Sequence, residues 1–260
     1  MTSFRVLPAA LAATAALLLP SAGRAAHGRH GASVTLSEKG DAVRCDQLDI
    51  SFGHHSAFRS EERVVVPAGR DALRIVVPES SGARIRGTDR RDFEVVACKA
   101  APSEEALSAI RLDTSNGVTV AGPGGGEWVG YLLIAAPRDA SIDVEATNGP
   151  ISLSGLGGAV VARAQNGPIS IKDSAGEIQA EAQNGPIHVQ GSSGHVRVQT
   201  ENGPIHVAIP DGYASAALIE ATGHSPWSCS GKACSGARRT DDDGRQSMAV
   251  SYTHLTLPTN

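Results

Sequence analysis

Apolar and polar residues alternate through the second half of the chain, and glycine interrupts the alternation every nine residues. The second and fourth residues after each glycine are small or apolar, whereas the residues between them are mostly polar. A period of two places one set of side chains on a buried face of a strand. The apolar set is rich in β-branched residues, which favours strands over helices. The spaced glycines are Gly149, Gly158, Gly167, Gly176, Gly185, Gly194, Gly203 and Gly212.

Every second nine-residue unit begins with the same phrase, Asn-Gly-Pro-Ile, so two such units make one full repeat. A short fixed period is typical of proteins whose units bury their apolar faces by stacking on neighbouring units. The sequence therefore predicts an all-β fold, a single-stranded parallel β-solenoid or β-helix. Its 18-residue coils have two nine-residue halves, and we expect a right-handed coil.

The repeated phrase also predicts the corners of each coil. Asn-Gly tolerates positive φ, and the proline that follows fixes φ where the chain re-enters a strand. Stacking of the coils at about 4.8 Å would align the asparagines into a ladder of side-chain amides. We expect this ladder to be structural, and it consists of Asn148, Asn166, Asn184 and Asn202.

The residues before the repeats are strand-like but irregular. Short strands are expected at 64–66, 73–77, 83–86 and 93–96, because proline and glycine separate these apolar runs. Residues 115–120 look like a degenerate coil without the proline. We therefore expect repeats over 111–224 with an insertion loop at 122–126, and an irregular β region at 26–110 that caps the first coil.

Composition and the amino terminus indicate export. The chain has 29 glycines, 3% aromatic residues and a formal net charge of −4, with no basic patch for nucleic acid. Residues 1–25 contain Arg5, an apolar stretch at 7–19 and small residues before Ala26, which is typical of a signal peptide. The stretch is too short to span a membrane. We expect a secreted or periplasmic mature chain without a membrane span.

Four cysteines fit two disulfides in an oxidising compartment. The favoured pairing joins Cys229 to Cys234 across a short loop and leaves Cys45 to pair with Cys98. A zinc site at Cys229, Cys234 and His224 is the alternative, but it lacks an evident fourth ligand. Residues 225–249 would then form a cysteine-containing loop that leads to a missing coil. Residues 250–260 include Ser-Tyr-Thr-His-Leu, similar to a translated sequencing adapter, and we expect this tail to be non-native.

Candidate chemistry on the repeats is sparse. The sequence has no nucleophile elbow, phosphate loop, zinc-protease motif or dinucleotide fingerprint. Glu145 and Glu181 share an outward position two coils apart, but Arg163 occupies it in the coil between them, so no carboxylate cluster for catalysis or calcium is expected. The acidic run at 241–243 fits a solvated turn. We expect no cofactor, no metal and no catalytic residue.

His188 and His206 occupy one outward position a full repeat apart, which predicts two imidazoles stacked about 5 Å apart. Two ligands make a weak metal site. The favoured interpretation is that both histidines continue the polar column begun by Ser152 and Ser170. With Arg197, they are the candidate surface-binding residues.

Ser-Gly-Ala-Arg-Ile-Arg-Gly-Thr-Asp-Arg-Arg-Asp-Phe-Glu-Val at 81–95, followed by the Asn-Gly-Pro-Ile units, resembles the bacterial β-strand-repeat “putative adhesin” family. The resemblance covers roughly residues 60–249. It implies an exported solenoid of parallel strands without catalytic residues. We expect a non-enzymatic module that binds a glycan, an envelope polymer or a protein. The alternative is an envelope scaffold that self-associates end to end, and a polysaccharide-active enzyme ranks third.

Overall fold

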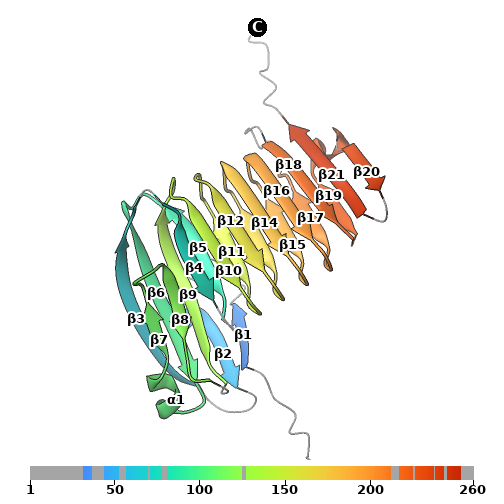
Figure 1. Cartoon of the computed structure of the whole chain (residues 1–260). Helices are drawn as coiled ribbons and strands as arrows, with labels where there is room; N and C mark the ends of the chain where they lie inside the picture. The colour runs from blue at the N-terminus through green and yellow to red at the C-terminus, as the bar shows by residue number, and fades with distance from the viewer. Residues whose placement is uncertain are drawn as a thin grey trace, which may run out of the picture.

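The computed structural model describes residues 32–36, 44–52, 57–69, 71–77, 81–124, 127–211, 217–224, 226–236, 238–242 and 245–252. This part of the chain is all-β, with parallel strands in two large mixed sheets (Figure 1). The expected signal peptide and residues 253–260 lie outside the described residues. No helix among the described residues is both long enough and apolar enough to cross a membrane.

Two large sheets and one hairpin contain the described strands. The nine-stranded sheet has the spatial order β19 (Trp227–Ser230), β17 (Ile205–Ala208), β15 (Ile187–Gln190), β13 (Ile169–Lys172), β11 (Ile151–Ser154), β5 (Ala83–Thr88), β9 (Val129–Pro137), β6 (Asp92–Ala101) and β3 (Phe58–Pro67). The ten-stranded sheet has the order β20 (Arg238–Asp242), β21 (Arg245–Tyr252), β18 (Ala217–Gly223), β16 (Gly194–Thr200), β14 (Glu177–Ala182), β12 (Val160–Ala164), β10 (Ile142–Ala146), β4 (Leu73–Val77), β8 (Val118–Ala121) and β7 (Arg111–Asp113). The hairpin pairs β1 (Ala32–Leu36) with β2 (Leu48–Phe52), and a short helix, α1 (Glu104–Ser108), follows β6.

Successive strands from β10 to β19 alternate between the two large sheets, so each strand pairs with the strand two places along the chain. From β10 to β17 these pairs are parallel and offset by one full repeat, as in the register of Ile151 with Ile169. The alternate residues that the sequence predicts to be buried form one core between the sheets. The 18-residue period of the repeat is therefore equal to the separation in sequence between paired residues of neighbouring strands.

The repeated corner glycines serve close packing. We expected positive φ at the Asn-Gly corners, but Gly149, Gly167, Gly185 and Gly203 are absent from the residues with positive φ. A Cβ atom on Gly185 would lie 2.3 Å from the carbonyl oxygen of Gly167 in the preceding repeat, and the other three corner glycines are equally crowded. Only glycine allows the backbones to stack this closely.

The strand pair next to the repeats differs from the expected one. β4 pairs in parallel with β10, and β5 pairs in parallel with β11, so residues 73–88 supply the neighbouring pair. We expected residues 115–120 to do so. Instead β8 lies on the far side of β4, and its antiparallel partner is β7. The segment from β6 to β9 is thus an insertion between two pairs of the stack.

Disulfides secure both ends of the described structure. Cys45 is bonded to Cys98, and β2 packs through Leu48, Ile50 and Phe52 on the outer side of β6 and β9 in a second apolar core. Cys229 is bonded to Cys234, as the sequence predicts, and both pack against the end of the main core. Because this bond engages both sulfurs, the zinc alternative with His224 is wrong. Residues 250–252 of the expected tail lie in β21, antiparallel to β18.

Candidate functional site: a groove on the ten-stranded sheet

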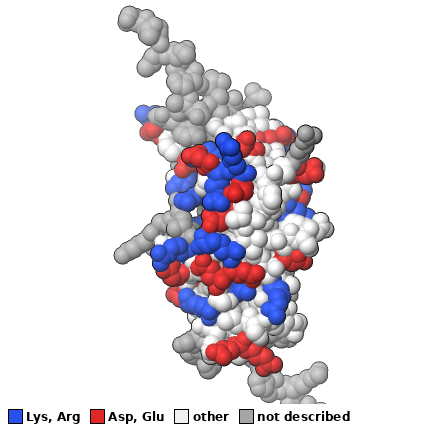
Figure 2. Space-filling model, turned by 90° about the vertical axis from the view of Figure 1, so that its left-hand side faces the viewer, with Lys and Arg blue, Asp and Glu red and all other residues white. Residues whose placement is uncertain are grey.

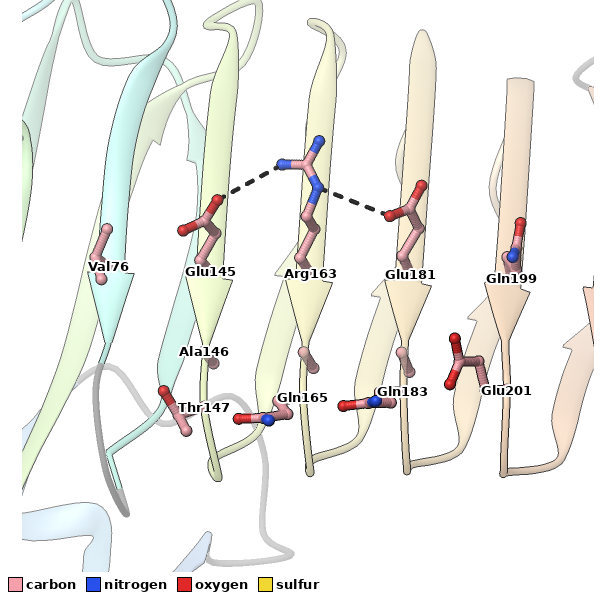
Figure 3. A pocket seen from close by; sticks show the side chains of 12 residues that line it. Val76, Glu145, Ala146, Thr147, Arg163, Gln165, Glu181, Gln183, Gln199 and Glu201 are labelled. Carbon is pink, nitrogen blue, oxygen red and sulfur yellow. Dashed lines mark ion pairs between the residues drawn. The ribbon is translucent and has the colours of Figure 1, made fainter.

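A shallow groove of about 430 Å³ runs across the ten-stranded sheet, perpendicular to its strands and beside the Asn-Gly-Pro-Ile corners (Figure 3). Two rows of polar side chains line it above a floor of alanines, and we call the two polar rows the groove rows. The strand row is Glu145, Arg163, Glu181 and Gln199; the corner row is Thr147, Gln165, Gln183 and Glu201; the floor is Ala146, Ala164 and Ala182.

The groove is hollow because β10, β12 and β14 of the ten-stranded sheet each end in a buried alanine. Ala146, Ala164 and Ala182 follow one another in register, and each is 5% or 6% exposed. Elsewhere in the repeat most inward positions carry isoleucine or valine. Thr200 takes the next place in this column, where its hydroxyl donates a hydrogen bond to the carbonyl of Gly185 at 3.2 Å. The alanine methyl groups therefore leave a depression between the polar rows.

Arg163 organises the strand row. Its guanidinium lies 3.8 Å from a carboxylate oxygen of Glu145 and 3.7 Å from one of Glu181, and 3.0 Å from Asp143 on the same side of the sheet. Figure 3 marks the ion pairs with the two glutamates. Arg74 lies 3.5 Å from Glu145. These side chains are roughly half exposed, so each pair contributes little to stability. Their main effect is to hold the side chains of the row in place.

The groove rows present both donors and acceptors of hydrogen bonds. Glu145, Glu181 and Glu201 supply carboxylate oxygens, and the glutamine amides supply one acceptor and two donors each. Gln165, Gln183 and Glu201 are exposed at the corner. Such an array suits ligands that carry many hydroxyl groups.

The predicted histidine stack lies on the opposite, nine-stranded sheet. The rings of His188 and His206 have centroids 4.9 Å apart and planes inclined by 18°. His206 Nδ1 is hydrogen bonded to Ser228 Oγ at 2.7 Å. The pKa of His188 is lowered, mainly by burial of its ring and to a smaller extent by the charge of the nearby His206. Ser152 and Ser170 precede the histidines in the same column of the sheet.

Arg197 does not join the histidines, although we grouped the three as surface-binding candidates. It lies on β16 of the ten-stranded sheet, where it is paired with Glu220 at 2.8 Å. His195 also contacts Glu220, at 3.1 Å, and hydrogen bonds from His195 and Arg197 lower the pKa of that carboxyl group. Residues nine apart lie on different sheets because consecutive strands alternate between them.

The asparagine ladder borders the groove at the corner. Asn166, Asn184 and Asn202 each donate a side-chain hydrogen bond of 2.9 Å to the asparagine of the preceding repeat, and Asn148 accepts the first. The ladder amides thus bond to one another.

Within the described ranges no three His, Cys, Asp or Glu side chains are grouped to hold a metal ion.

Sequence reasoning missed the groove itself. The sequence shows the alternation of Glu145, Arg163 and Glu181, but nothing in that alternation places the corner row beside it. The signal in the sequence is the alanine that precedes each corner once per repeat, because a column of small residues at one position leaves room above it.

No family model and no curated protein matches the chain. Among solved structures it is similar to a “putative cell adhesion protein” from Clostridium sporogenes, with 10% identity and a TM-score of 0.33 over 63% of this chain and 76% of that chain. A “putative adhesin” from Parabacteroides merdae shows 10% identity and a TM-score of 0.27 over 66% and 96% of the two chains. One from Parabacteroides distasonis shows 11% identity and a TM-score of 0.26 over 61% and 84%.

Proposed function

We propose that the chain is an exported, non-enzymatic β-solenoid module that binds a polyhydroxylated glycan of a cell envelope in the groove rows. The observation that carries the proposal is the groove itself, where hydrogen-bonding side chains from four neighbouring strands of the ten-stranded sheet lie in register. The parallel pairs offset by one repeat around one core support the solenoid.

The spacing of the groove suits a polymer. Neighbouring strands lie about 4.8 Å apart, so equivalent side chains recur at that interval along the groove. A polymer with repeating hydroxyl groups can meet the same kind of partner at each strand. Because the side chains stand on paired strands, little ordering is required when the ligand binds.

The charges of the groove support a binding role over a catalytic one. Hydrolysis of a glycosidic bond requires two carboxyl groups that flank the bond, with space between them for the sugar and for water. Arg163 lies between Glu145 and Glu181 and is paired with both. Its guanidinium occupies the place that the reacting bond would need.

Two disulfides among the described residues support export, since such bonds persist in oxidising compartments.

The edge strand β3 bears on the alternative of end-to-end assembly. It carries Arg59, Glu61, Glu62 and Arg63, and Figure 2 shows charges of both signs over this end of the molecule. Charged edge strands disfavour pairing with another chain. A binding module is therefore the better interpretation.

Binding of the disulfide-bonded full chain to an array of envelope glycans tests the proposal, with light scattering on the same sample. Gln165→Ala with Gln183→Ala removes two amides of the corner row, and we expect affinity for a glycan that binds to fall about tenfold. Asn116→Ala removes an exposed amide from the turn between β7 and β8, outside both the groove rows and the face of the other sheet, and is the control. Absence of glycan binding, or equal losses in both variants, would contradict the proposal; growth into large assemblies would favour the scaffold.

A further inference from the structure

The repeat strands of the two sheets differ in the acidic residues that they carry. The ten-stranded sheet carries five acidic residues on its repeat strands: Asp143, Glu145, Glu177, Glu181 and Glu220. The strands β5, β11, β13, β15, β17 and β19 of the nine-stranded sheet carry none. Their charged residues are Arg84, Arg86 and Lys172. We call the outward side of these six strands the cationic face.

Strand register arranges the cationic face in two rows. One row is Arg84, Ser152, Ser170, His188, His206 and Ser228, and the other is Arg86, Ser154, Lys172, Gln190, Ala208 and Ser230. Arg86 and Lys172 are exposed and lie two strands apart, with Ser154 between them. The separation of their strands is about 10 Å. The nearest acidic residue along the chain is Asp173, in the turn after β13.

Few carboxylates of the described residues compete for these two cations. Neither Arg86 nor Lys172 is in an ion pair with another described residue, whereas Arg74, Arg163 and Arg197 of the other sheet all are. The positive charges of Arg86 and Lys172 are therefore available to an anion from outside the described chain. The paired arginines of the ten-stranded sheet are largely neutralised by their own neighbours.

We propose that the cationic face binds an anionic polysaccharide, with Arg86 and Lys172 on its carboxylates and the serines on its hydroxyl groups. The hydroxyl rows distinguish this ligand from a simple polyanion, because Ser152, Ser154 and Ser170 can donate to or accept from sugar hydroxyls. Apart from the two histidines, the outward positions of the two rows carry no aromatic side chains on which nucleic-acid bases could stack. They carry no large apolar side chains to insert into a lipid layer.

This surface is separate from the groove rows, which lie on the other sheet. One molecule could thus hold an anionic envelope polysaccharide on one side while its groove takes a second glycan on the opposite side. The cationic face would then attach the protein to the envelope.

Immobilised polygalacturonate is the probe, and the full chain with intact disulfides is the analyte, at low and high NaCl. We expect saturable binding that weakens with salt. Arg86→Gln with Lys172→Gln should weaken it about tenfold, from the loss of two exposed charge contacts. The matched control, Arg74→Gln with Arg197→Gln, removes the same charge from the ten-stranded sheet and should leave affinity within about twofold.

Four outcomes would overturn the inference: no binding to polygalacturonate, equal loss in the two double variants, equal binding to uncharged dextran, or equal binding to polyphosphate. The last would show that charge alone is recognised. Gln165→Ala with Gln183→Ala should retain full binding to polygalacturonate, so that failure of the groove proposal is distinguishable from failure of this one. Circular dichroism and the urea midpoint of each variant show that it is folded.

Discussion

Replacement of one corner glycine by alanine should strongly destabilise the stack of strands. A Cβ atom on Gly185 would lie 2.3 Å from the carbonyl oxygen of Gly167, about 1 Å inside the 3.4 Å at which ordinary contact begins. Backbone atoms form the contact, so a change of side-chain rotamer cannot relieve it. The two repeats must move apart at this corner.

The movement would strain hydrogen bonds on both sides of the corner. The amide of Asn184 donates to the carbonyl of Gln165 at 2.8 Å, and that of Ile169 donates to Pro186 at 3.0 Å. Overpacking costs about 1–3 kcal/mol, and each weakened hydrogen bond adds about 0.5–1.5 kcal/mol. Alanine also lowers the conformational entropy of the unfolded chain, which offsets about 0.4–1 kcal/mol of this loss in stability. Gly185→Ala should therefore lower the free energy of unfolding by about 3 kcal/mol.

Urea unfolding of the oxidised protein measures this change, followed by circular dichroism and tryptophan fluorescence. With an m-value of about 2–3 kcal/mol per molar, the midpoint should fall by about 1 M or more. Gly124→Ala is the control, since a Cβ atom there meets nothing within 4 Å, and its midpoint should be unchanged. An unchanged midpoint for Gly185→Ala, or equal shifts for both variants, would refute the argument from close stacking.

Three further changes test other parts of the structure. Asn184→Ala removes two ladder hydrogen bonds and should cost about 1–2 kcal/mol in urea unfolding, and Asn148→Ala, which removes one, should cost about half as much; equal costs would contradict the ladder. Because the pKa of His188 is lowered in the folded chain, the unfolded chain binds more protons as the pH falls below about 6.5, so stability should decrease there. His188→Gln should reduce that decrease, measured by urea unfolding at pH 7.5 and 5.5; an unchanged slope would contradict it. Cys45→Ser with Cys98→Ser, which opens a span of 53 residues, should cost about 4 kcal/mol, whereas Cys229→Ser with Cys234→Ser, which opens a span of 5, should cost about 2 kcal/mol; the reverse order would contradict the chain-entropy argument.

The repeat part of the fold could be predicted because the same alternation of apolar and polar residues recurs in each repeat. The alternation after Gly149, Gly167 and Gly185 indicated both the buried residues and the pairing offset. The neighbouring pair, β4 and β5, could not be predicted to join the stack. It lacks the Asn-Gly-Pro-Ile phrase, and the strands from β6 to β9 separate it from β10 in sequence.

The surfaces were harder to predict than the core. Sequence reasoning placed Arg197 with His188 because both are outward residues of neighbouring strands, but neighbouring strands belong to opposite sheets. The role of the corner glycines was also misjudged, because an Asn-Gly pair gives the same signal whether positive φ or close packing requires it. Only the distance from Gly185 to the carbonyl of Gly167 distinguishes the two causes.

The identical register of successive repeats makes the length of this protein a quantity that genetic recombination can change in whole steps. Deletion of residues 184–201 would join Gln183 to Asn202, and the asparagine and glycine columns would continue without a break. Each duplicated or deleted unit would lengthen or shorten the groove and the cationic face together by about 4.8 Å. Natural variants that differ by whole repeats would then hold longer or shorter stretches of the same polymer.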